Sequence, residues 1–67
     1  MNGVGNKLKI FRMKKGLTIK ALADLSKLSA GYICHLEKGT RKNPSIEMMD
    51  KIAIALNKSV SEVFFNG

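Results

Sequence analysis

Positively charged side chains are concentrated in the first part of this sequence. Residues 1–42 contain ten lysine and arginine residues and two acidic residues, whereas residues 43–67 contain two basic and three acidic residues. The chain of 67 residues carries a formal charge of +7. Because lysine and arginine bind phosphate groups, this excess predicts a polyanionic partner such as nucleic acid, or an anionic membrane surface.

Cys34 and His35 are adjacent and have side chains that bind metals. A zinc site needs about four ligands, and the sequence contains one cysteine and one histidine, so we expect no metal site and no cofactor. Catalysis is not expected, since the sequence shows no paired carboxylates, no nucleophile with a base and no phosphate-binding loop. One cysteine cannot form an intramolecular disulfide, and no signal-peptide pattern is present, so we expect a cytoplasmic protein.

Two short helices joined by a turn are predicted over residues 18–38. Thr18 and Ser29 are residue types that cap helix N-termini, because their side-chain oxygens accept hydrogen bonds from free backbone N–H groups. Gly39 is typical of a residue that ends a helix. One face of each helix is apolar and the opposite face is open, which predicts a helix-turn-helix motif. The apolar residues are Leu22 and Ala23 in the first helix and Ile33 and Leu36 in the second.

Three further helices are predicted around this motif, which makes the fold class all-α with five short helices. A single domain is expected over residues 1–67, with residues 1–5 as a frayed arm. The turn between the two central helices is expected to place Lys27 in a left-handed conformation. The first additional helix is predicted over residues 6–15, and its buried stripe is Val4, Leu8 and Phe11. The second is capped by Ser45 and runs to Leu56, and its buried stripe at helical spacing is Ile46, Met49, Ile52, Ala53 and Leu56. The last helix begins with a capping box of Ser59 and Glu62, and its side chains Val60, Val63 and Phe64 are expected to close the core.

A set of residue types in this order and spacing resembles the phage repressor and Cro family of DNA-binding domains, also called the xenobiotic response element family. The residues that carry the resemblance are Leu17-Thr18, Leu22-Ala23, Ser29, Tyr32-Ile33, Leu36-Glu37, Gly39, Asn43-Pro44-Ser45 and the stretch NKSVSEVF at 57–64. The resemblance implies a lambda-repressor-like domain whose helix-turn-helix lies at helices 2 and 3, with an ion pair between Arg12 and Glu37. It also implies a transcriptional regulator, expected to be a repressor, that inserts its third helix into the major groove of double-stranded DNA as a homodimer.

The positions that usually read bases in this family are Ala30, Gly31, Cys34 and His35 in this chain. None is arginine, asparagine or glutamine, the side chains suited to bidentate base contacts. Cys34 is either a half-exposed helix residue or an apolar contact near a thymine methyl group, with an oxidation sensor as a third alternative. His35 is either solvated or in direct contact with DNA.

Phosphate contacts are expected around the same motif. Tyr32 is expected to pack with its ring while its hydroxyl reaches a phosphate. Lys38, Arg41 and Lys42 follow the recognition helix and are expected to contact the DNA backbone rather than to form only a solvated charge run. The predicted DNA-binding set is Thr18, Lys27, Ser29, Ala30, Gly31, Tyr32, Cys34, His35, Lys38, Arg41, Lys42 and Asn43.

A dimer surface is expected in the C-terminal part, where Met48, Ile54 and Phe65 have no assigned place in the core.

Two other classes of function compete with DNA binding. One is a protein-interaction module, such as an antitoxin or regulator subunit, that uses the same fold. The other is a cationic membrane-active peptide, which the short capped helices argue against because such peptides form one long amphipathic helix. No small-molecule ligand is evident from the sequence.

Overall fold

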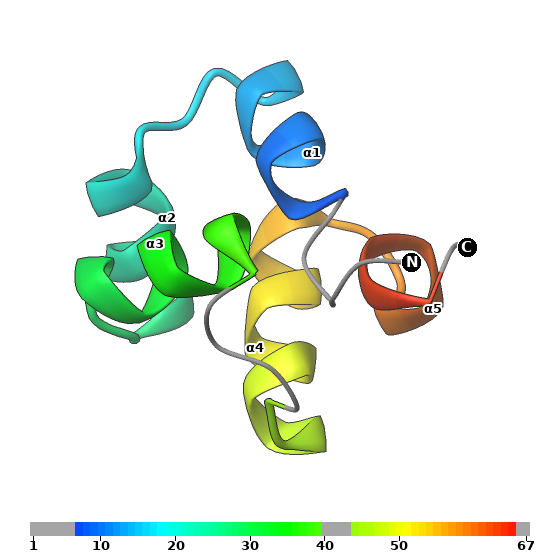
Figure 1. Ribbon diagram of the computed structural model, residues 1–67. Helices are drawn as coiled ribbons and strands as arrows, with labels where there is room; N and C mark the ends of the chain where they lie inside the picture. The colour runs from blue at the N-terminus through cyan, green and yellow to red at the C-terminus, as the bar shows by residue number, and fades with distance from the viewer. Residues whose placement is uncertain (1–6, 40–43, 66–67) are drawn as a thin grey trace.

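The computed structural model describes residues 7–39 and 44–65, and these residues form the five predicted helices and no strand (Figure 1). The all-α fold class is confirmed. The first helix is shorter than the predicted 6–15, and Val4 and Asn6 lie outside the described residues. No helix in the described part of the chain has the length and hydrophobicity needed to cross a membrane. The helices are α1 (Leu8–Lys14), α2 (Ile19–Ser26), α3 (Ala30–Lys38), α4 (Ile46–Leu56) and α5 (Val60–Phe64).

The predicted N-terminal caps are present at the last four helices. Thr18 Oγ1 accepts a hydrogen bond from the N–H of Ala21 at 3.0 Å, and Ser29 and Ser45 cap α3 and α4 in the same way. Ser59 and Glu62 form the predicted capping box, in which Glu62 accepts from the Ser59 N–H at 2.9 Å. This hydrogen bond to the carboxylate is the main reason why the pKa of Glu62 is lowered.

Left-handed residues follow four helices, at Gly16, Lys27, Gly39 and Asn57. Three of these ends, at Gly16, Lys27 and Asn57, share one further backbone hydrogen bond. The left-handed conformation predicted for Lys27 is confirmed, with φ of 61°. At each of the three ends the following N–H reaches back to a carbonyl five residues earlier, which satisfies one of the free carbonyls at the helix end. These bonds are Leu17 to Arg12 at 3.1 Å, Leu28 to Ala23 at 2.9 Å and Lys58 to Ala53 at 2.9 Å.

One hydrophobic core is shared by all five helices. α4 lies centrally in Figure 1, with α2 and α3 on one side and α5 on the other, and it packs directly against α2 and α5. Phe11 and Val60 are half-buried and pack against this core. Its buried members are Leu8, Leu22, Ala23, Ile33, Leu36, Met49, Ile52, Leu56, Val63 and Phe64.

Ile46 was wrongly predicted to belong to the buried stripe of α4. Its side chain is 70% exposed, whereas Met49, Ile52, Ala53 and Leu56 are buried as predicted. Ile46 is the first residue of α4, and Figure 1 shows that the first turn of this helix extends beyond the other described helices. Helical periodicity identifies a face but does not say how far along the helix that face is covered.

Candidate nucleic-acid interface

Arg12 on α1 and Glu37 on α3 form an ion pair with two hydrogen bonds. Arg12 Nε donates to Glu37 Oε2 at 2.5 Å, and Nη2 donates to Oε1 at 3.2 Å. The third contact of the guanidinium is Nη1 to the carbonyl of Leu17 at 2.7 Å. The two side chains are only 11% and 6% exposed, so the pair is largely removed from water. The guanidinium therefore fixes α3 relative to α1 and to the start of the α1–α2 connection.

The last residue of α2 is a buried polar residue that sequence reasoning missed. Ser26 is 2% exposed, and its hydroxyl donates to the carbonyl of Leu22 at 2.7 Å. A serine near a helix end reads as a surface or turn residue, so no local pattern indicated its burial. The hydroxyl is satisfied within α2, which allows α2 and α3 to pack closely at this corner.

The predicted base-reading residues lie on the side of α3 that points away from the core. Ala30, Gly31 and His35 are exposed, and Cys34 is half-buried. A β-carbon added at Gly31 would meet no atom within 4 Å. Since Ile33 and Leu36 are fully buried, α3 has one covered face and one face open to a partner.

The predicted phosphate-binding residues are placed at the ends of the same two helices. Thr18, Lys27, Ser29 and Lys38 are exposed at the caps or last turns of α2 and α3. Tyr32 is half-buried and packs against the core. The remaining members of the predicted set, Arg41, Lys42 and Asn43, lie outside the described residues.

The predicted dimer residues differ in their availability. Ile54 is 77% exposed and Phe65 is 61% exposed, but Met48 is half-buried and offers less surface than the sequence suggested. Ile54 also meets Leu25 of α2 at a hollow of about 260 Å³. Leu25 is 58% exposed, but the sequence did not indicate that it belongs to the same apolar surface as Ile54. The two residues lie 29 positions apart, and only the packing of α2 against α4 brings them together.

No metal centre is formed by the described residues. Among 7–39 and 44–65, no three or more His, Cys, Asp and Glu side chains are grouped so as to hold an ion.

Comparison with known proteins identifies the family. The sequence model of a helix-turn-helix family matches residues 8–63, which includes α1 to α4 and nearly all of α5. The chain belongs to this helix-turn-helix family. The match includes Arg12, Glu37 and the complete α2–α3 motif.

Individual members of the helix-turn-helix family are similar to nearly the whole chain. The transcriptional regulator ClgR of Mycobacterium tuberculosis is 36% identical over 63 residues, which are 94% of this chain and 55% of ClgR. The chain spans about half the length of the curated relatives it matches.

Solved structures agree with this assignment. The restriction-modification controller protein C.AhdI of Aeromonas hydrophila has a TM-score of 0.83 and 38% identity, over 90% of this chain and 89% of that one. The biofilm regulator SinR, solved in complex with DNA, has a TM-score of 0.84 and 29% identity, over 88% of this chain and 94% of that one. The helix-turn-helix assignment therefore holds for both sequence and three-dimensional structure.

Proposed function

We propose that this protein is a sequence-specific DNA-binding transcriptional regulator that inserts α3 into the major groove. The observation that carries the proposal is the open face of α3, held in place by the buried Arg12–Glu37 pair and the α2–α3 corner. The similarity to SinR, which was solved with DNA, supports the same use of the fold. An α-helix of this kind fits the width of the major groove of B-DNA.

Phosphate contacts are proposed to supply most of the affinity. Lys27 and Lys38 are exposed at the ends of α2 and α3, and the N-termini of both helices add the positive ends of their dipoles. Arg41 and Lys42 are proposed to add to this set from the following segment. Such contacts position the protein but carry no sequence information.

Base readout is proposed to be limited to a few positions. Ala30, Gly31 and Cys34 offer apolar contacts, of the kind that recognise a thymine methyl group, and His35 is the one member of the four with strong hydrogen-bonding groups. Specificity would then come in part from the shape and deformability of the operator.

A homodimer is proposed to form through the C-terminal part. Ile54 and Phe65 are exposed apolar side chains, and residues 43–67 carry only two basic and three acidic residues. Two copies can therefore approach there without the repulsion that the basic part would cause. A two-fold dimer would set two α3 helices about 34 Å apart on successive turns of DNA. We propose that this dimer acts as a repressor in the cytoplasm and catalyses no reaction.

Selection of bound sequences from a pool of random duplex DNA tests this function. We expect an enriched motif with two-fold symmetry. Gly31→Glu should abolish its binding, because the open space at Gly31 accepts the side chain without unfolding while the added charge faces the phosphates. Met13→Glu on the exposed side of α1 adds the same charge elsewhere and should retain binding.

If the selection enriches no motif, a protein-interaction module becomes the alternative function. If no motif is enriched and Gly31→Glu binds duplex DNA like the parent, the α3 face is not a DNA surface. The protein-interaction module would then be the better account of this fold.

A further inference from the structure

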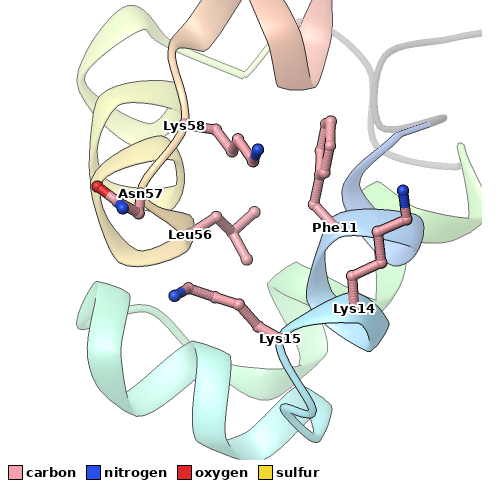
Figure 2. Close-up of a pocket in the computed structure, with 6 residues that line it drawn as sticks. All are labelled: Phe11, Lys14, Lys15, Leu56, Asn57 and Lys58. Atoms are coloured by element: carbon pink, nitrogen blue, oxygen red, sulfur yellow. The ribbon is translucent and has the colours of Figure 1, made fainter.

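Three lysines surround a hollow on the side of the molecule formed by α1 and the turn between α4 and α5. The hollow has a volume of about 310 Å³, and no α3 residue lines it. Figure 2 shows the ring of Phe11 and the side chain of Leu56 between the lysine side chains. Its lining residues are Phe11, Lys14, Lys15, Leu56, Asn57 and Lys58.

This cluster could not be predicted from the sequence, because α1 and the α4–α5 turn are far apart in the chain. Lys14 and Lys15 by themselves read as charges that suit the C-terminal end of α1. Lys58 is different, since its ammonium group lies 5.2 Å from the centre of the Phe11 ring, a cation–π distance. The fold therefore brings three lysines to one hollow and places one of them, Lys58, over the Phe11 ring.

The positive charge of this hollow is not neutralised by its own lining, which contains no acidic residue. Glu62 is close enough to Lys58 for the lysine to contribute to its lowered pKa, but its carboxylate already accepts the N–H of Ser59. The other ion pairs described in the structure are Arg12–Glu37 and Lys20–Asp24, which use acids elsewhere. An anion entering the hollow would thus relieve the mutual repulsion of the lysines.

We propose that this hollow binds a small molecule that joins a phosphate group to a flat apolar group. The phosphate is held by the ammonium groups of Lys15 and Lys58, two of the three lysines that line the hollow. The flat group packs against the half-buried ring of Phe11. Asn57 adds an amide at the rim.

The size and chemistry of the hollow favour this class over a bare anion. Ligand sites of proteins commonly have volumes of about 300 to 1,000 Å³, so this hollow suits a compact ligand. Lysine binds phosphate as a point charge, and two lysines at one site match the double charge of a phosphate monoester near neutral pH. A site that offered only charge would not need an aromatic ring in its lining.

Titration with adenosine 5′-monophosphate, followed by amide chemical shifts in NMR, tests the proposal at constant ionic strength. We expect saturable shifts at Phe11, Lys15 and Leu56 to Lys58. Inorganic phosphate and adenosine, tested separately, should each bind more weakly, because each supplies half of the recognition. Shifts confined to the N-termini of α2 and α3 would place the nucleotide on the DNA-binding face and overturn the proposal.

Charge-matched variants separate this site from general attraction to a basic protein. Lys15→Met and Lys58→Met should each weaken binding by roughly two- to fivefold, the range expected for one exposed ionic contact. Lys9→Met removes the same charge from the exposed side of α1, outside the hollow, and should leave affinity unchanged. Equal weakening in all three variants, or no saturation in the parent, would overturn the proposal without affecting DNA recognition by α3.

Discussion

The two parts of this molecule share one core but have different surfaces. Residues 7–39 form α1 to α3 and residues 44–65 form α4 and α5, and both contribute fully buried side chains. The first part is strongly basic, and its two acids, Asp24 and Glu37, both pair with basic side chains. The second part is close to neutral. Large apolar side chains are exposed in both parts: Ile10, Met13 and Leu25 in the first, and Ile46, Ile54 and Phe65 in the second.

This difference separates two kinds of recognition. A basic surface attracts a polyanion over a distance, and it repels a second copy of itself. A nearly neutral surface with exposed apolar groups can meet its own copy, because apolar burial is favourable and the charge repulsion is small. The contrast predicts DNA contacts in the first part and self-association in the second, and the following variants test it.

Glu37→Ala should have the largest effect, and its effect should be on folding. The variant leaves the nearly buried guanidinium of Arg12 without its carboxylate, which we expect to cost about 3 kcal/mol. For a chain of 67 residues this corresponds to a lowering of Tm by roughly 15 °C in a thermal melt.

The double variant Arg12→Met with Glu37→Leu tests whether the loss of stability comes from the unpaired charge on Arg12. Because it removes both charges, it should be more stable than Glu37→Ala. A melting curve of Glu37→Ala that overlays the parent curve would show that the pair contributes nothing to stability.

Phe65→Glu should weaken operator binding by about tenfold or more while leaving the monomer folded, because it places a charge in the proposed dimer contact. Gel-shift titration measures the affinity, and circular dichroism checks the fold. Met13→Glu is a matched control, since Met13 and Phe65 are both 61% exposed. If the two variants bind the operator equally well, the dimer surface lies outside Phe65.

Lys38→Ala should reduce the salt dependence of DNA binding. With about four phosphates neutralised in each half-site, log Kd should change with log salt with a slope near 7, and this variant should lower the slope by roughly one to two. Lys51→Ala in the second part is the control and should leave the slope unchanged. Filter binding over a range of salt concentrations measures the slopes. Equal slopes for both variants would contradict the proposal that DNA contacts lie in the first part of the molecule and not in the second.

Lys27→Gly should stabilise the fold slightly. Lys27 adopts a left-handed conformation with φ of 61°, which a β-carbon disfavours, so glycine should add about 0.5 to 1 kcal/mol to the free energy of unfolding. Asn57→Gly is the counterpart in the second part, and it should gain less because asparagine tolerates this conformation. Urea denaturation compares the two, and a larger gain at Asn57 would contradict the reasoning.

The smallest expected effect is the contribution of Glu62 to the pH dependence of stability. The pKa of Glu62 is lowered from 4.5, first by the hydrogen bond from the Ser59 N–H. The folded state therefore favours the ionised carboxylate, so its stabilisation is present above pH 4.5 and is lost as pH falls through the lowered pKa. Glu62→Gln should flatten the decline of Tm on the acid side; an unchanged decline would exclude this carboxylate as a contributor.

Local structure and the charge of the surface were predictable from the order of the residues. Cap residues such as Thr18 and Ser59, and the helical spacing from Met49 to Leu56, predicted the helices because capping and amphipathic periodicity depend on neighbours within a few residues. The uneven distribution of charge, which favours a polyanionic partner for the first part, could also be counted directly from the sequence.

Two features depend on how the helices pack in three dimensions: which predicted helix faces are buried, and which residues distant in the sequence lie close together. Ile46 fits the period of α4 but is exposed, whereas Ser26, at the end of α2, is buried. The hollow that joins Phe11 to Lys58 has no signal in the sequence, because the two residues lie on different elements. Burial and encounter depend on how the helices pack, and that packing is a property of the whole core.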